Sequence, residues 1–188
     1  MFHGKILLAS QSPRRKELLK LAGINFRAIA ADVDESHDGK ISAEEFPEHL
    51  ALKKARAVFS KAAKDEVLLA ADTIVLKEGV IYGKPEDRND AIRILQALAD
   101  ARHTVITGVC LLSGEKSITF SESTAVYFNP LTAEQIAWYV DHCQPFDKAG
   151  AYAIQEWIGV VGIKKIEGCY FNVMGLPVSR VWQELQKI

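Results

Sequence analysis

The chain contains 188 residues, with 23 lysines and arginines against 24 aspartates and glutamates, so its formal net charge is −1. Hydrophobic residues make up 48% and charged residues 25%, which is typical of a globular domain, or of two small lobes that share a core. The balanced charge argues against a protein that wraps nucleic acid, and no apolar run reaches the roughly 18 residues of a membrane-spanning helix.

The first predicted elements are a short apolar strand over residues 5–9 and a helix over 13–22. Ser12 is a typical N-cap residue, and Pro13 suits the first helical position. Gly23 stands where a helix commonly ends. This strand, turn and helix open the chain.

A second strand is expected over 24–33, followed by an acidic loop. Residues 42–45 form a capping-box pattern, and Pro47 indicates a brief turn before the main helix, which extends to about residue 63. Apolar residues at helical spacing predict the buried stripe of that helix, namely Ala51, Ala55, Val58, Phe59 and Ala62.

An apolar strand is predicted over 67–76, with a turn at Glu78-Gly79. Asp87 can cap the next helix. The β-branched and aromatic segments 103–112 and 117–128 predict two strands joined by a Ser-Gly-Glu turn.

Thr132 can cap a helix that ends near residue 142. The remaining predicted elements are strands near 158–165 and 170–173 and a last helix from about 176. Helices therefore alternate with strands and hairpins, which favours the α/β class with a mixed sheet flanked by helices.

Three cations, Arg14, Arg15 and Lys16, open the helix that follows Ser12, although the positive end of the helix dipole disfavours them there. They form either a solvated face or part of an anion site. Free backbone N–H groups at a helix start suit a phosphate, and arginine binds phosphate oxygens through two N–H donors.

Asp72 and Thr73 interrupt an apolar strand, so the carboxylate must be hydrogen-bonded to the local backbone, bound to a metal, or catalytic. Lys84 precedes Pro85 in a glycine-containing segment. That segment lacks the spacing of a phosphate-binding P-loop, since only three residues separate Gly79 from Gly83.

Lys54 adjoins the apolar stripe of its helix and either extends to solvent or serves a site. Glu35 lies in the acidic loop, where a solvated role is the alternative. The segment 146–155 combines small residues with Asp147, Lys148 and Gln155. No His or Cys cluster has metal-ligand spacing, so a metal here would be a hard cation held by carboxylates.

The three cysteines, Cys110, Cys143 and Cys169, are far apart in the sequence and odd in number. This pattern predicts free thiols in a reducing cytoplasm rather than a disulfide framework.

Six segments together resemble the Maf family of nucleoside triphosphate pyrophosphatases over essentially the whole chain, 1–188, taken as a single domain. They read LASQSPRRKELL, LKKARAV, ADTIV, GKPEDRNDA, TGVCL and DKAGAYAIQ. The resemblance implies a mixed sheet with helices around it, in two lobes with a central cleft, as in inosine triphosphatases. It also implies hydrolysis between the α- and β-phosphates with Mg²⁺ or Mn²⁺, and a homodimer.

Matched position by position, the resemblance implies that Asp72 is the catalytic carboxylate and that Glu35 joins it in assisting the metal or the water. It also implies that the triphosphate is bound by Ser10, Arg14, Arg15, Lys54 and Lys84. Arg14, Thr73 and Gln155 match positions that mark the branch of the family that prefers dTTP and UTP. The implied role is house-cleaning, which is the clearance of non-canonical or excess nucleotides. Ala153 and Glu156 stand where glycines are commoner, so they bear on the shape of the base-selecting loop.

Two other activities remain open at this point. One is a pyrophosphatase for modified nucleotides such as 7-methyl-GTP, and the other is a nucleotide-binding regulator of cell division without turnover. The basic residues alone fit either a binder or an enzyme. A pure phosphate binder, however, gains nothing from Asp72 close to a polyanion unless a metal intervenes.

Overall fold

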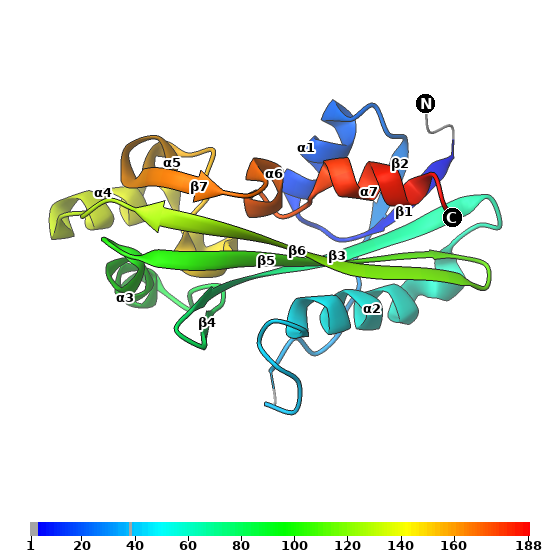
Figure 1. Cartoon of the computed structure of the whole chain (residues 1–188), viewed down its shortest axis with the longest axis horizontal. Helices are drawn as coiled ribbons and strands as arrows, with labels where there is room; N and C mark the ends of the chain where they lie inside the picture. The colour runs from blue at the N-terminus through cyan, green and yellow to red at the C-terminus, as the bar shows by residue number, and fades with distance from the viewer. Residues whose placement is uncertain (1–3, 38) are drawn as a thin grey trace. The chain divides into compact units, whose positions relative to one another are not determined.

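A computed structural model describes residues 4–37 and 39–188 and shows an α/β fold with a mixed seven-stranded sheet (Figure 1). The strands pair in the order β2-β1-β3-β5-β6-β7, with β4 against β3. β1 is parallel to β2 and β3, whereas β4 is antiparallel to β3 and β7 to β6. The predicted fold class is therefore confirmed. The strands are β1 (Lys5–Ala9), β2 (Phe26–Ile29), β3 (Glu66–Lys77), β4 (Val80–Tyr82), β5 (Arg102–Ser113), β6 (Lys116–Phe128) and β7 (Ile163–Glu167).

Seven α-helices and three short 3₁₀ turns accompany the strands in the described residues. None of these helices combines the length and the apolar character that a membrane crossing requires. The helices are α1 (Pro13–Leu21), α2 (Phe46–Val58), α3 (Arg88–Leu98), α4 (Ala133–Cys143), α5 (Trp157–Gly162), α6 (Tyr170–Val173) and α7 (Val178–Leu185). The turns are η1 (Phe59–Lys61), η2 (Pro145–Asp147) and η3 (Ala149–Ala151).

The chain divides into two compact units, as the predicted two lobes require. Unit 1 consists of Met1–Asp72, Thr107–Glu122 and Gly175–Ile188, and unit 2 of Thr73–Ile106 and Ser123–Met174. Strands β3, β5 and β6 contribute residues to both. The central cleft, and the treatment of 1–188 as one domain, stay predictions.

The core of unit 1 forms where α2 packs on the sheet. Leu7 in β1 and Leu68 and Ala70 in β3 are fully buried against Ala51 and Ala55 of the helix. Because successive strand residues point to opposite faces, their neighbours along the strands point away from α2. In Figure 1, α1 and α7 lie on the other side of these strands from α2.

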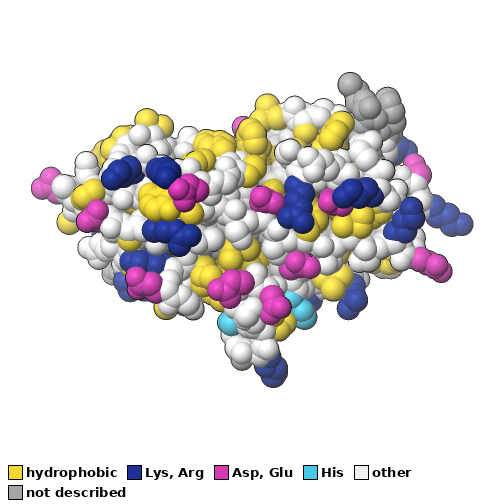
Figure 2. Space-filling view, in the orientation of Figure 1, with side chains coloured by type: hydrophobic (Ala, Val, Ile, Leu, Met, Phe, Trp, Pro, Cys, Tyr) yellow, Lys and Arg dark blue, Asp and Glu magenta, His cyan; other side chains and the backbone are white. Residues whose placement is uncertain are grey.

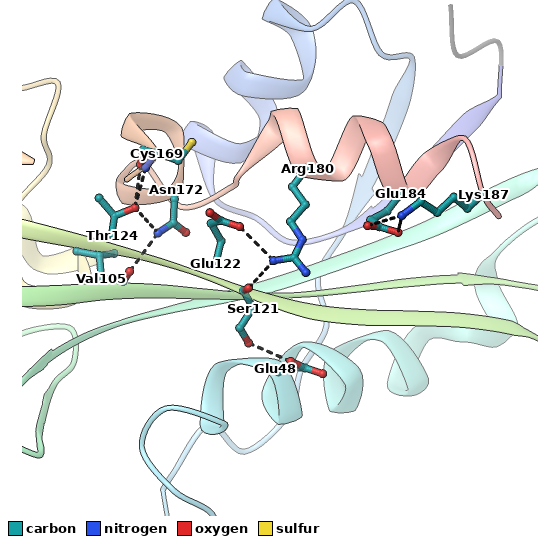
Figure 3. Close-up of polar contacts among 10 residues, drawn as sticks. All are labelled: Glu48, Val105, Ser121, Glu122, Thr124, Cys169, Asn172, Arg180, Glu184 and Lys187. Carbon is teal, nitrogen blue, oxygen red and sulfur yellow. Dashed lines mark hydrogen bonds and ion pairs between the residues drawn. The ribbon is translucent and has the colours of Figure 1, made fainter. Parts of the chain in front are cut away.

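The start of α2 is fixed by contacts with β5 and β6. At Gly108 in β5, any Cβ atom would overlap the backbone of Pro47 and Glu48, so only glycine lets the helix begin there. The Ser121 hydroxyl donates to the Glu48 carboxylate at 3.0 Å, and the Ser121 carbonyl accepts from Arg180 in α7 at 2.8 Å (Figure 3). Both helices are thereby tied to β6.

Unit 2 has its own core, in which aromatic side chains of different elements meet. His103 is fully buried, with Nε2 2.8 Å from the Tyr152 hydroxyl and its ring edge-on to Phe128. Burial lowers the pKa of His103 to about 3. Asn172 donates to the Val105 carbonyl at 3.1 Å and so ties α6 to β5 (Figure 3).

Several local predictions are confirmed by the backbone. The Ser12 hydroxyl accepts from the Arg15 N–H at 3.5 Å, and Pro13 opens α1. Gly23 follows that helix with a φ of 67°. Thr132 and Gln135 form the complete capping box of α4.

Other predictions were wrong. Helix α2 ends at Val58 rather than near 63, and Phe59 is 39% exposed instead of joining the buried stripe. The segments Trp157–Gly162 and Tyr170–Val173 are helices, although strands were expected there. Tertiary contacts override the β propensity of these residues, as with the hydrogen bonds that Asn172 of α6 donates to Val105 in β5 and Thr124 in β6. Strand β2 is also shorter than the expected 24–33, because only four residues pair with β1.

The cysteines Cys110, Cys143 and Cys169 are free thiols, as predicted, and Cys110 is buried. Desolvation raises the pKa of the Cys110 thiol to about 12, which makes it an inert core residue.

Candidate active site

The residue pair Ser10 and Arg15 closes the turn between β1 and α1. Arg15 is buried, and its Nη1 donates to the Ser10 hydroxyl at 3.2 Å while its Nε donates to the Gly175 carbonyl at 2.7 Å. The Ser10 hydroxyl also accepts from the Ser12 N–H at 3.2 Å. The guanidinium is therefore directed inward, away from a solvated face.

The other two cations of this turn differ from Arg15. Lys16 makes an exposed hydrogen bond to Gln11 at 3.1 Å, which matches the solvated-face alternative for this one residue. Arg14 is half-buried, and its charge lowers the pKa of the neighbouring Arg15 guanidinium. No acidic residue lies in the first turn of α1, so that turn keeps a positive field.

Lys54 stands between two carboxylates. Its Nζ lies 2.7 Å from Asp72 Oδ1 and 2.7 Å from Glu35 Oε1. The side chains of Lys54 and Asp72 are only 9% and 12% exposed, whereas that of Glu35 is 44% exposed. The alternative in which Lys54 extends to solvent is wrong, and Asp72 has a buried ammonium as a partner.

The period of the strand explains why Lys54 reaches Asp72. Leu68, Ala70 and Asp72 alternate along β3, so all three side chains share the face that α2 covers. Lys54 lies one turn beyond Leu50 and Ala51 on the buried side of α2. A strand carboxylate and a helix ammonium therefore meet inside an apolar layer.

Electrostatics join these residues into one cluster. Desolvation lowers the pKa of Arg15, while the negative charges of Asp72 and Glu35 partly oppose that shift. Unit 1 thus brings together Ser10, Arg14, Arg15, Glu35, Lys54 and Asp72 from four segments of the chain. Such a set pairs cations for a polyanion with carboxylates for a metal or a water.

Asp72 and Glu35 are the candidate metal ligands of this cluster. The described part of the chain holds no group of three or more His, Cys, Asp or Glu side chains placed for a metal. Asp72 and Glu35 nevertheless converge on one cationic atom, Lys54 Nζ. Two carboxylates fit Mg²⁺ bound together with substrate phosphates and water, because that ion seldom takes an all-protein cage.

The remaining predicted residues, Thr73, Lys84 and Gln155, belong to unit 2. Lys84 and Gln155 are exposed and Thr73 is half-buried. The Gly150 N–H donates to the Gly83 carbonyl at 3.0 Å, so the loop with Lys84 runs beside the loop that leads to Gln155. Asp72 and Thr73 are consecutive in β3 and point to opposite faces.

Two residues near Gln155 were not selected from the sequence as site candidates. Lys148 is buried with Nζ 2.8 Å from Asp147 and 3.4 Å from Glu156, and Tyr139 donates to Glu156. A lysine within a run of small residues was the available signal for Lys148. Tyr139 carried none, because its spacing is that of any core aromatic on a helix.

The surface view agrees with the balanced charge of the sequence. On the face drawn in Figure 2, cationic and anionic side chains are interspersed and form no single-sign field. The absence of a nucleic-acid partner stays a prediction.

The sequence matches proteins of one family over nearly its whole length. A sequence model of the family described as Maf-like protein matches residues 5–188. The dTTP/UTP pyrophosphatase of Bacteroides fragilis is 49% identical over 185 residues, which cover 98% of this chain and 96% of that protein. The dTTP/UTP pyrophosphatase of Thermosipho africanus is 49% identical over 181 residues, 96% of this chain and 92% of the relative. The solved Ham1 protein of Staphylococcus aureus is 15% identical with a TM-score of 0.47, over 66% of this chain and 71% of that one.

Proposed function

The chain belongs to the Maf-like protein family, and from that premise we propose that it is a nucleoside triphosphate pyrophosphatase that favours dTTP and UTP. The reaction cleaves the bond between the α- and β-phosphates and yields a nucleoside monophosphate and pyrophosphate. Support comes from relatives named dTTP/UTP pyrophosphatase that are 44–49% identical over nearly the whole chain.

One observation carries the proposal in the structure itself. Lys54 bridges Asp72 and Glu35 at 2.7 Å each, next to the arginines of the first turn of α1. A protein that only binds phosphate needs the cations but is weakened by a buried carboxylate near the polyanion. The combination favours an enzyme over a nucleotide-binding regulator.

The cations stabilise the negative charge of the leaving group, pyrophosphate. A triphosphate carries about four negative charges, which repel an attacking water. Arg14 and Lys54 neutralise phosphate oxygens and stabilise the departing pyrophosphate, and the family resemblance implies the same role for Lys84. Arg15 is already bonded to Ser10 and Gly175, so it holds the Ser10 turn in place and adds its field.

Asp72 and Glu35 would hold a divalent cation, Mg²⁺ or Mn²⁺, when the substrate is bound. Such an ion would supply charge neutralisation at the phosphates and lower the pKa of water. Lys54 then exchanges its carboxylate partners for phosphate oxygens, since a lysine ammonium has three rotatable donors. Asp72 orients the attacking water or accepts its proton.

Three further features belong to the proposal. The enzyme acts in the cytoplasm, where its free thiols remain reduced. It clears unwanted nucleotides, and it works as a homodimer.

A panel of triphosphates with Mg²⁺ tests the activity. We expect UMP and dTMP with pyrophosphate from UTP and dTTP, and slower turnover of ATP, GTP and 7-methyl-GTP. Orthophosphate as the first product would overturn cleavage between the α- and β-phosphates. A preference for 7-methyl-GTP would assign the chain to the other substrate class, and binding without turnover would leave only the regulator.

A further inference from the structure

The exposed Gln155 side chain is carried by a tight turn. The Glu156 N–H donates to the Ala153 carbonyl at 3.1 Å, so residues 153–156 form a turn in which Gln155 is the third residue. Tyr152, Ala153 and Ile154 before it are each at most 6% exposed. The turn therefore exposes the Gln155 side chain, whereas the three residues before it are buried.

One phenol group fastens both ends of this turn. The Tyr139 hydroxyl donates to Glu156 Oε2 at 2.5 Å and accepts from the Ala153 N–H at 3.2 Å. Tyr139 is fully buried on α4, and desolvation together with the Glu156 carboxylate raises the pKa of its hydroxyl. The proton thus remains on the phenol, as the bond to Glu156 requires.

Two further contacts complete the support. Lys148 Nζ lies 3.4 Å from the other oxygen of Glu156, which balances the carboxylate charge. Any Cβ at Gly159 in α5 would overlap the Ile154 carbonyl oxygen. Glycine at 159 therefore lets the helix lie directly against the turn.

A glutamine that selects a pyrimidine base must present its amide donor and acceptor to the correct edge of that base. Uracil and thymine offer a carbonyl acceptor beside an N–H donor, whereas cytosine offers the reverse pattern. A side-chain amide carries both a donor and an acceptor, and a half-turn of its terminal torsion matches either edge. Base selection therefore requires first that the amide be held at one place, and the backbone conformation of the turn restricts the χ1 rotamers that place it there, although not the terminal torsion.

We propose that Tyr139 and Glu156 are positioning residues for base selection, which hold the 153–156 turn so that the Gln155 amide lies at one place when uracil or thymine binds. This inference rests on the proposed function. It gives the Glu156 carboxylate, which accepts from Tyr139, a role in this chain.

The test compares Tyr139→Phe with the wild-type enzyme on UTP and CTP. We expect the KM for UTP to rise about tenfold while kcat changes less than about threefold, because the phosphate site is untouched. The preference for UTP over CTP in kcat/KM should fall about tenfold. Tyr127→Phe is the matched control, since Tyr127 also donates to a glutamate, Glu167, at 2.8 Å, but on the surface.

A second set of variants separates positioning from folding. Glu156→Gln keeps an acceptor for Tyr139 and should stay within about threefold of wild type, whereas Glu156→Ala should match Tyr139→Phe. In a Gln155→Ala background, Tyr139→Phe should no longer change the preference, because it acts through Gln155.

Results that contradict the positioning role can be distinguished from a result that contradicts the proposed function. If Tyr139→Phe lowers only the melting temperature, or if its effects add fully to those of Gln155→Ala, the positioning role is wrong while the activity stands. A wild-type protein that turns over no triphosphate overturns the proposed function and this inference with it.

Discussion

Replacing Lys54 by methionine removes the cation that two carboxylates share while keeping most of the side-chain volume. Unit charges about 4 Å apart attract by about 4 kcal/mol at an effective dielectric constant near 20. In the variant no ammonium group has to be desolvated on folding, and this avoided cost offsets part of that loss. Glu35 is 44% exposed, so it can turn to water and contributes less than about 1 kcal/mol. Asp72 is 12% exposed and cannot do so.

We therefore expect Lys54→Met to lower the free energy of unfolding by about 2–3 kcal/mol, nearly all of it through Asp72. Urea denaturation of wild type, Lys54→Met, Asp72→Asn and the double variant measures the coupling directly. The neighbouring Lys53→Met serves as control, because Lys53 donates to the exposed Asp34 carbonyl at 2.7 Å. A coupling energy below about 0.5 kcal/mol would refute the buried-pair account.

Three further predictions concern the site, the core and the start of α2. Asp72→Asn should keep the fold and lower kcat on UTP by at least about a hundredfold, measured by pyrophosphate release; wild-type turnover would remove Asp72 from the chemistry. The pKa of His103 is about 3 in the folded chain, against 6.5 when unfolded, so the unfolded state takes up a proton first. Stability should then fall as pH drops from 6.5 toward 3, and His103→Phe should flatten that slope in urea titrations; an unchanged slope contradicts this. Gly108→Ala should cost about 1–3 kcal/mol and also slow UTP hydrolysis, since it displaces the helix that carries Lys54; full activity would show that α2 adapts.

Local chemistry made much of the fold predictable. Ser12 with Pro13, and Thr132 with Gln135, satisfy the orphan N–H groups of their own helices, so their effect is readable over a few residues. Asp72 was identifiable as a site candidate because a carboxylate within an apolar strand must have a special partner.

The failures arose where distant contacts decide the outcome. Tyr170–Val173 contains aromatic and β-branched residues, yet it is helical where Asn172 binds Val105 and Thr124, which are 67 and 48 residues away. Arg15 is buried because its guanidinium binds the carbonyl of Gly175, which is 160 residues away. Tyr139 has the spacing of an ordinary core residue, and its hydroxyl acquires a role only through Glu156 and Ala153. No short window of sequence contains such partners.

The central claim is that water attacks the α-phosphorus of a pyrimidine triphosphate and that pyrophosphate leaves. Phosphorus NMR of UTP hydrolysis in oxygen-18-enriched water tests it most directly, because the isotope marks the phosphorus that is attacked. We predict that the label enters UMP and that the pyrophosphate remains unlabelled. Label in pyrophosphate, or UDP with orthophosphate as products, would contradict the account.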